Sequence, residues 1–570
     1  MPASPSLNPV GALVLRLGRQ QRLIVDAVVL GAAGAVTAQI FTLLLRGASW
    51  LLLESLAGYR PPGLPDEGGV LQEMVGPHGL WLVPLVAAGG GLLVGILVQH
   101  LAPETEGHGT DTVVQAFHRA EGVIRARVPP VKLLASALTI GSGGAAGREG
   151  PIAQTAAGIG SVYATLTGRA GADRRRLLLV GTAAGLAAIF RSPIGAALFA
   201  IEVLYADMEF ESTALLPAML ASVIAYALNG FFVGWRPLFR VPTELTLVNA
   251  TDNLWYLVLG IGAGIVATVV PELFYGVRDA FRSLRIRPEL KPALGGLLLG
   301  GLALVWPQVI GGGYGWMQEA IDGRLATATL VALVFAKPVA MSLTVSSGGS
   351  GGVFAPTLFI GSMLGGLLAA LAHQPAAPFV IVGMAAVFAG AAHVPVATLM
   401  MVTEMTGGYT LLVPAALAVM ISYLVQRRLA GRLRYQSLYE AQVATRADSP
   451  AHHAEHLKIA LRILKERRVL DSAGVGELDL LSLLRAGIPV ELPDGGRLVI
   501  GVLRADSPYR EQPLSAVDGR LGEDTRIFAI IRGEHMLAPR PDTVLQKGDR
   551  LMLLTTAATL VGLQQHFDKW

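Results

Sequence analysis

Cysteine is absent from all 570 residues, so neither a disulfide nor a thiolate metal site can contribute to this protein. Charged residues are scarce, at 15% of the chain, compared with about 25% in typical soluble domains. The formal net charge is +4, and no basic stripe is interleaved with aromatic residues. We therefore expect no nucleic-acid partner. The sequence also lacks H-E-x-x-H and GxxxxGK[ST] motifs, which leaves no common zinc-hydrolase or P-loop signature.

Hydrophobic residues make up 52% of the chain, far more than one water-soluble core requires, which predicts that the bilayer is its solvent. A membrane-spanning helix needs about 20 consecutive apolar residues. The 68 glycines and 33 prolines indicate closely packed and broken helices. The candidate apolar windows are 24–46, 79–100, 254–272, 292–311, 326–345, 377–402 and 411–426.

Basic residues flank several of these windows and predict the orientation of the chain. Arg16, Arg19 and Arg22 precede the first window, which has no clear cleavage pattern and is interpreted as a retained span. Further clusters follow at 278–291 and 427–434. Because such clusters prefer the cytoplasm, we expect a multi-pass protein of the cell (inner or plasma) membrane with both termini cytoplasmic. Residues 1–24 would then be a cytoplasmic N-terminal segment.

An internal repeat is visible in two recurring signatures. The pattern Gly-x-x-x-Pro occurs as GREGP at 147–151 and as GVFAP at 352–356, each after a run of glycine and serine. The pattern G-x-A-A, followed by Pro and then Glu nine residues later, ends at Glu202 and again at Glu404. Two halves at about 25–235 and 250–440 follow from this spacing. In membrane transporters such halves meet at a midplane site built from helix N-termini.

Glu149 stands out because an ionisable residue among membrane glycines is costly and is by default functional. Many of the glycines could instead serve only helix packing. The segment GGSGG at 348–352 fits the G-x-S-x-G pattern of serine hydrolases. That pattern requires a preceding strand, whereas this segment follows an apolar membrane stretch, so we expect no enzymatic activity.

The pentapeptide GREGP resembles the gating segment of the CLC family of chloride channels and chloride/proton antiporters. The resemblance covers roughly 25–445, includes Lys132 in PPVKLL, and makes Glu149 the gating glutamate. A carboxylate can compete with an anion for its site and leave when it is protonated. Pairing of a buried Glu149 with Arg148 is the alternative interpretation. The resemblance further implies a homodimer, one anion pathway per subunit, chloride as the transported ligand and no cofactor.

Other family positions supply the expected anion-binding residues. GGVFAP at 351–356 would place the backbone amides of Val353 and Phe354 on the central anion, because helix starts bind anions. Tyr439 in SLYEA resembles the family tyrosine that donates to the same ion; without the resemblance it would be an interfacial anchor. The other residues expected to bind the anion are His108, Gly109, Arg148 and Gly150.

Two departures from the family affect the predicted mechanism. The stretch APETEGHGTDT carries His108 where the family usually has serine, and Asp111 where it has proline. Acid could therefore strengthen anion binding at His108, unless only the backbone amide of His108 matters. Val203 follows Glu202 where many family antiporters carry a proton-relaying glutamate. This favours a gated chloride channel; a chloride/proton antiporter relying on Glu202 or Glu149 is the alternative, and a receptor or intramembrane hydrolase is a remote one.

The chain changes character beyond about 450, where hydrophobic runs shorten and charges become frequent. The segments 497–503, 526–532 and 550–556 are typical of buried strands. We expect a linker at 446–470 and a regulatory domain at 471–570 that resembles the RCK C-terminal (TrkA-C-type) domain. That resemblance implies a nucleotide regulator, with cyclic di-AMP as one candidate. The expected fold is an all-α polytopic membrane domain with inverted repeats and many tilted and broken helices, plus a small α+β cytoplasmic domain.

Overall fold

The structure is a computed structural model, and the chain forms two units, Met1–Gln442 and Val443–Trp570, each considered by itself. The described residues are 18–64, 69–241, 252–452, 490–491, 496–504, 506–517, 520–521, 525–532, 535–556, 559, 563 and 566–568. Residues 1–17 of the expected N-terminal segment, 453–470 of the expected linker and 471–489 of the expected regulatory domain lie outside them.

The first unit consists almost entirely of helices, and the two sequence halves contribute similar series. The first half contains α2 (Arg19–Ser49), η1 (Trp50–Leu56), α3 (Val83–Leu101), η3 (Pro103–Thr105), α4 (Thr110–Arg119), α5 (Val128–Gly141), α6 (Glu149–Leu166), α7 (Ala172–Phe190), α8 (Pro193–Glu202) and α9 (Ser212–Val233). The second half contains α10 (Asp252–Ser283), η4 (Pro288–Leu290), α11 (Lys291–Ala303), η5 (Pro307–Val309), α12 (Tyr314–Ile321), α13 (Thr327–Val345), α14 (Phe354–Ala372), α15 (Ala376–Ala392), α16 (Pro395–Thr406), η6 (Tyr409–Leu411) and α17 (Leu412–Ala430). One hairpin, β1 (Tyr59–Arg60) with β2 (Met74–Val75), joins α2 to α3.

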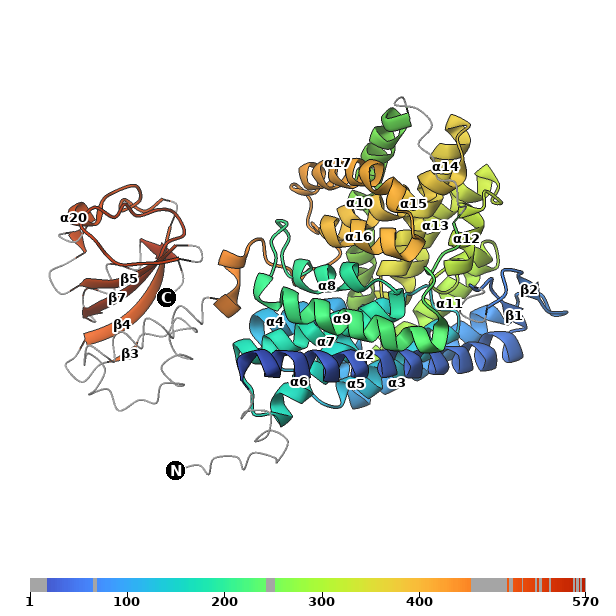
Figure 1. The fold of residues 1–570 in the computed structure, drawn as a ribbon, viewed down its shortest axis with the longest axis horizontal. Coiled ribbons are helices and arrows are strands. Elements are labelled where there is room, and N and C mark those ends of the chain that lie inside the picture. The colour runs from blue at the N-terminus through green and yellow to red at the C-terminus, as the bar shows by residue number, and fades with distance from the viewer. Residues whose placement is uncertain are drawn as a thin grey trace. The chain divides into compact units, whose positions relative to one another are not determined.

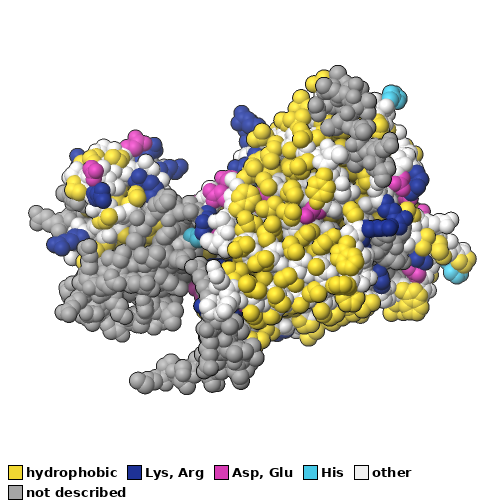
Figure 2. Space-filling view, viewed as in Figure 1, with side chains coloured by type: hydrophobic (Ala, Val, Ile, Leu, Met, Phe, Trp, Pro, Cys, Tyr) yellow, Lys and Arg dark blue, Asp and Glu magenta, His cyan; other side chains and the backbone are white. Residues whose placement is uncertain are grey.

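Seven described helices are long and apolar enough to cross a membrane. Two of them, α9 and α14, lie outside the windows expected from sequence. Figure 2 shows a broad hydrophobic surface on the first unit. Large apolar side chains are exposed in this unit, including Leu43, Phe231, Phe335 and Val413. Such a surface would be unfavourable in water, so this unit is a membrane domain.

Two expected windows are broken rather than continuous. The window 292–311 contains only the short helix α11, which is followed by the 3-10 turn η5. The window 377–402 is two helices, α15 and α16, separated at His393 and Val394. His393 adopts a left-handed backbone with φ of 57°, and Pro395 then starts the next helix because its ring suits the first helical position. Average hydropathy cannot detect such a break.

Equivalent helices pack in equivalent ways, which confirms the internal repeat. Helix α6 packs on α7 as α14 packs on α15, and α2 packs on α9 as α10 packs on α17. Helix α7 contacts α9 as α15 contacts α17. Figure 1 shows α2 running along α9 within the first half of the unit.

Two glutamates join the halves by capping each other's helices. Glu202 ends α8 and accepts hydrogen bonds of 3.1 and 2.6 Å from backbone N–H groups in the first turn of α16. Glu404, near the end of α16, accepts bonds from the Ser192 hydroxyl (2.6 Å) and the Gly195 N–H (2.9 Å) at the start of α8. Carboxylates stabilise helix N-termini. Helices α8 and α16 therefore run antiparallel, so these equivalent elements of the two halves are inverted.

Replacing Glu404 with alanine is expected to destabilise the membrane domain, because each buried donor that loses its acceptor costs about 1–3 kcal/mol. Thermal unfolding of the detergent-purified protein should show a clear decrease for Glu404→Ala and a smaller one for Glu404→Gln, whose amide oxygen still accepts. Glu289→Ala, at a partly exposed acid whose carboxylate lies 3.9 Å from His100 Nε2, is the control and should be close to neutral. Equal stability of the Glu404→Ala variant and the wild type would contradict the capping role.

The second unit contains a small antiparallel sheet. Its strands are β3 (Val490–Glu491), β4 (Gly496–Leu503), β5 (Arg526–Arg532), β6 (His535–Leu537), β7 (Arg550–Thr556) and β8 (Phe567–Asp568), with the short helix α20 (Leu514–Val517) and, before them, the turn η7 (Arg446–Asp448). The order is β3-β4-β7-β5-β6, with β8 paired to β4. Buried side chains including Val499, Ile530 and Leu553 form its core. The three strands expected from sequence are confirmed, and so is the overall fold class.

Candidate functional site

Three glycine-rich loops from both halves are tied together by backbone hydrogen bonds. The N–H of Gly107 donates to the carbonyl of Gly349 (2.9 Å), and the N–H of Gly351 donates to the carbonyl of Gly107 (3.2 Å). Gly147 and Gly352 exchange two further bonds of 2.7 and 2.6 Å. These pairings hold the loops before α4, α6 and α14 side by side, although the loops are far apart in sequence.

Each of the three loops leads into a helix. Helix α4 begins at Thr110, α6 at Glu149 and α14 at Phe354, with Val353 as the residue before its first turn. The unpaired N–H groups and the positive ends of the helix dipoles therefore converge on one region. Backbone N–H groups at helix starts bind anions without a fixed positive charge. The convergence is suited to a small anion that must also be released.

Two glycines are required where the loops approach each other most closely. A side chain at Gly150 would overlap the carbonyl oxygen of His108, and one at Gly147 would overlap the carboxylate of Glu149. At both positions the space is already occupied by backbone or by the acid itself. The glycines of GREGP thus serve the geometry of this site.

Glu149 is the first residue of α6 and is only 2% exposed. The Tyr314 hydroxyl, from the first residue of α12, donates a hydrogen bond to Glu149 Oε1. The Arg148 guanidinium lies 4.8 Å from the centre of the Tyr314 ring. Arg148 therefore stacks on the tyrosine that holds Glu149.

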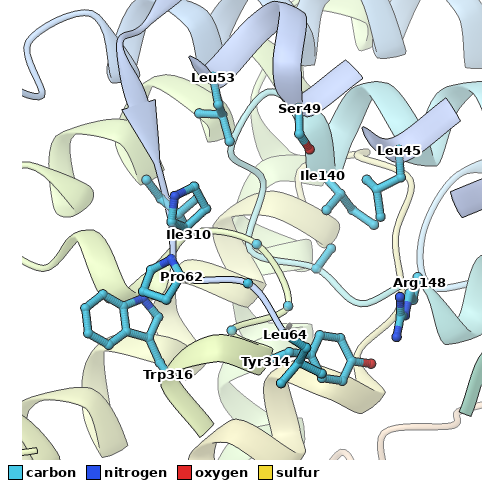
Figure 3. A pocket seen from close by; sticks show the side chains of 16 residues that line it. Leu45, Ser49, Leu53, Pro62, Leu64, Ile140, Arg148, Ile310, Tyr314 and Trp316 are labelled. Carbon is cyan, nitrogen blue, oxygen red and sulfur yellow. The ribbon is translucent and has the colours of Figure 1, made fainter. Parts of the chain in front are cut away.

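Two cavities lie on either side of this hydrogen bond. The larger has a volume of about 180 Å³, and its walls include Arg148, Tyr314, Leu53, Pro62 and the glycines before Tyr314. In Figure 3 the Arg148 and Tyr314 side chains lie close to each other on one side of this cavity. The smaller cavity is lined by Glu149 and by the helix starts. Because Tyr314 lines one cavity and Glu149 the other, their hydrogen bond lies between the two.

The smaller cavity brings together five of the residues expected from sequence: Glu149, Gly150, Val353, Phe354 and Tyr439. Leu186, Phe190 and Phe199 form its apolar wall. Tyr439 is buried, and its side chain hydrogen-bonds with that of Thr110. Three other expected residues do not line it: His108, Gly109 and Arg148. Arg148 lines the larger cavity, and the His108 ring lies 5.5 Å from that of Tyr439.

Tyr314 was missed by sequence reasoning, although the repeat contains a signal for it. Applied to Gly107–Thr110, the offset of about 205 residues leads to the GGGY segment that ends at Tyr314. The loop before α12 is thus the counterpart of the loop before α4. The Tyr314 side chain in this loop reaches Glu149, at the start of α6 in the other half.

Two buried lysines support these equivalent loops. The Lys132 amine in α5 donates to the carbonyl of Gly107 (2.8 Å) and to that of Thr105 (2.9 Å). The Lys337 amine in α13 donates to the carbonyl of Gly311 (2.7 Å) and to the carbonyl two residues earlier (2.8 Å). Each lysine therefore fixes a loop that carries a side chain of the site.

The residues considered for an internal proton path have other roles in the structure. Both oxygens of Glu202 accept hydrogen bonds from the start of α16. Val203 is buried, and its carbonyl accepts a bond of 3.1 Å from the Gln442 amide.

Ser350, in the segment that resembles a hydrolase motif, bonds through its hydroxyl to the Thr105 carbonyl and to Ser136. Its hydroxyl is thus used to join loops.

Comparisons with known proteins agree with this architecture. The family described as voltage gated chloride channel matches residues 90–427, and the TrkA-C domain matches residues 498–565. A protein of Ralstonia nicotianae named "Putative chloride channel protein ClcB-like" is 31% identical over 69% of this chain and 91% of its own length. An H(+)/Cl(-) exchange transporter ClcA of Salmonella arizonae is 30% identical over 77% and 95%. The ClcA exchange transporter of Vibrio campbellii is 31% identical over 63% and 79%.

Two solved structures share the fold of the membrane domain. A slow cyanobacterial Cl-/H+ antiporter aligns with a TM-score of 0.61, over 76% of this chain and 97% of that chain. A CLC-type fluoride/proton antiporter aligns with a TM-score of 0.62, over 75% and 98%. Both are 24% identical in sequence, which supports the fold alone.

Proposed function

We propose that this chain, which belongs to the voltage gated chloride channel family, exchanges chloride for protons and uses Glu149 as both gate and proton carrier. Its family transports chloride across membranes. The observation that carries the proposal is the buried Glu149 carboxylate, held by Tyr314 between two cavities at converging helix starts. A carboxylate there competes with an anion when charged and withdraws when protonated. Proton binding and anion passage are thereby coupled at one group.

Two kinds of observation bear on the choice between exchange and passive conduction. Val203 and the capping role of Glu202 favour a gated channel, because neither residue offers a free proton acceptor. Two relatives that match along most of the chain are named exchange transporters. We favour exchange because the acid at Glu149 remains and because these relatives are named as exchange transporters.

A flux measurement tests the proposal. Purified protein in liposomes with a chloride gradient should drive protons against their own gradient, and both fluxes should stop together when chloride is withdrawn. A reversal potential that follows chloride alone would overturn exchange and support a channel. Absence of any anion flux would overturn transport and leave the receptor and hydrolase alternatives.

Removing the Tyr314 hydroxyl is expected to release the gate. A hydrogen bond to a charged group contributes about 1.5–3 kcal/mol, so Tyr314→Phe should raise chloride turnover by roughly tenfold while the protein remains folded. The control is Tyr409→Phe, since Tyr409 is 57% exposed and lies outside the site. Chloride efflux from liposomes measures both. Unchanged or slower turnover in Tyr314→Phe would show that the bond does not hold the gate closed.

The remaining assignments extend the proposal to the whole chain. The anion would interact with N–H groups at Val353 and Phe354, with Tyr439, and near His108. The second unit, which matches the TrkA-C domain, would regulate transport on binding a nucleotide such as cyclic di-AMP. The basic residues that flank the spans support a protein of the cell membrane with both termini cytoplasmic. The protein would be a homodimer, as the family resemblance implies. The proposed divisions are 1–24, 25–445, 446–470 and 471–570.

A further inference from the structure

His108 lies beside the anion cavity, where its imidazole ring contacts the cavity wall. The residue is 6% exposed. Its ring centre lies 5.5 Å from that of Tyr439, which lines the cavity, and 6.1 Å from that of Phe274 in α10. The side chain is thus buried next to the proposed anion site, and not directed into solvent.

A carboxylate fixes one side of this ring. His108 Nε2 lies 3.2 Å from Asp111 Oδ2. Asp111 is itself held, since its Oδ1 accepts a bond from the Ala441 N–H (3.2 Å). Its Oδ2 lies 3.5 Å from the Tyr275 hydroxyl, which donates to the Leu438 carbonyl (2.8 Å). A carboxylate at Nε2 favours the neutral tautomer that carries its proton there. The other nitrogen, Nδ1, is then the basic one.

Nδ1 of His108 is buried and has no hydrogen-bond partner among the described residues. A buried polar atom without a hydrogen-bond partner costs free energy. Binding of a ligand at Nδ1 would therefore stabilise the site. A proton on Nδ1 turns this atom into an N–H donor, which a bound anion can accept from and for which the described residues provide no acceptor. It also converts the ring into a cation beside the anion cavity.

We propose that His108 and Asp111 form a proton-binding pair, so that protonation of His108 and occupation of the anion site favour each other. This inference rests on the proposed anion transport at the site. With neutral His108 the pair has a charge of −1, which opposes a nearby chloride. With protonated His108 the pair has no net charge, and the imidazolium ring lies next to Tyr439, which lines the cavity. By linkage, each ligand then raises the affinity for the other by the same factor.

Other titratable groups around the pair leave this assignment intact. Glu149 lines the same cavity as Tyr439, so the gate acid lies in the same region. The Tyr275 hydroxyl lies 3.5 Å from Asp111, and the Arg278 guanidinium lies 4.3 Å from the centre of the Tyr275 ring and pairs with Glu440. On the side of α5, the Lys132 amine binds the carbonyl of Gly107, next to His108 in the chain. Of these groups, Glu149 is the one whose titration has to be separated experimentally from that of His108.

Under the proposed exchange, His108 would also be a titratable group, which Val203 cannot be. In an exchanger a proton must reach Glu149 from the opposite side of the membrane, and a valine cannot carry it. His108 lies in the loop before α4, which is bonded to the loops before α6 and α14. Within the pair, Asp111 fixes the ring through Nε2 and is a positioning residue, and His108 is the group that holds the proton.

Chloride binding measured by calorimetry tests the inference in the Glu149→Gln background, where the gate neither titrates nor competes. The full-length protein in detergent should bind chloride roughly tenfold more tightly at pH 5.5 than at pH 7.5, a coupling of ordinary size. Adding His108→Ser should abolish this difference. Adding Asp111→Asn should reduce the difference, because the ring loses the carboxylate that fixes its Nε2 side. His100→Ser, at an exposed histidine, should behave like the background.

An equal pH dependence with and without His108 would overturn the inference. Thermal unfolding would reveal whether Asp111→Asn folds. If it does not, His108→Gln, which also has an uncharged side chain at this position, replaces it. Its chloride affinity should be independent of pH, as in His108→Ser. The outcome is separate from that of the flux test. Failure of uphill proton movement in wild-type liposomes would reject exchange, whereas only a pH-independent chloride affinity rejects the pair.

Discussion

Replacing Glu149 with glutamine is expected to stop proton movement completely, while chloride still crosses the membrane no more slowly than in the wild type. Glutamine has nearly the same shape, and its amide oxygen can still accept a bond from the Tyr314 hydroxyl. It cannot bind and release a proton near neutral pH, and it has no charge with which to compete for an anion site. The variant should therefore be an uncoupled chloride pathway.

Simultaneous recordings of chloride and proton flux in liposomes measure this effect. Glu289→Gln, an acid near the surface at η4, is the matched control and should keep both fluxes. Continued uphill proton movement in Glu149→Gln would show that another group carries the proton. Loss of both fluxes from a folded variant would mean that the carboxylate is needed for anion passage itself, which contradicts a gate.

Local sequence signals predicted much of this site because its core consists of helix starts. GREGP and GVFAP each mark a loop that ends in a helix, and Glu149 and Phe354 are the first helical residues. The repeat predicted two related halves, and the antiparallel α8 and α16 agree with an inverted arrangement. Glycine, proline and the position of one acid carry this information within a few residues, where local backbone geometry decides the structure.

Long-range partners could not be predicted in the same way. Tyr314 reaches Glu149 across 165 residues, and Glu202 caps a helix that begins almost 200 residues later. From sequence, Glu202 remained a candidate proton carrier because nothing local shows where its carboxylate points. The sequence shows Asp111 only as a departure from the family pattern. Its position three residues after His108, at a helix start, nevertheless permits contact between the two side chains.

Replacing Lys132 with methionine is expected to be among the most destabilising single changes in the membrane domain. Its amine satisfies two carbonyl groups in the loop before α4, and methionine has a similar length but no donor. Losing each of these bonds costs about 1–3 kcal/mol, although the carbonyls of Gly107 and Thr105 each keep one other donor, the Gly351 N–H and the Ser350 hydroxyl. Lys337→Met removes the same two kinds of bond in the loop before α12 and should cost a similar amount.

The two variants should differ in function because the loops carry different side chains. Lys132 holds the loop of His108, so Lys132→Met should weaken chloride binding, measured by calorimetry in the Glu149→Gln background. Lys337 holds the loop of Tyr314, so Lys337→Met should instead speed chloride turnover, as Tyr314→Phe does.

Thermal unfolding compares the stabilities of the Lys132→Met and Lys337→Met variants, with Lys291→Met as the neutral control. If both lysine variants lost stability but had identical effects on binding and turnover, the lysines would support the fold in general and would not position separate parts of the site. The division of labour between the repeats, one loop serving the anion and its counterpart serving the gate, depends on that difference.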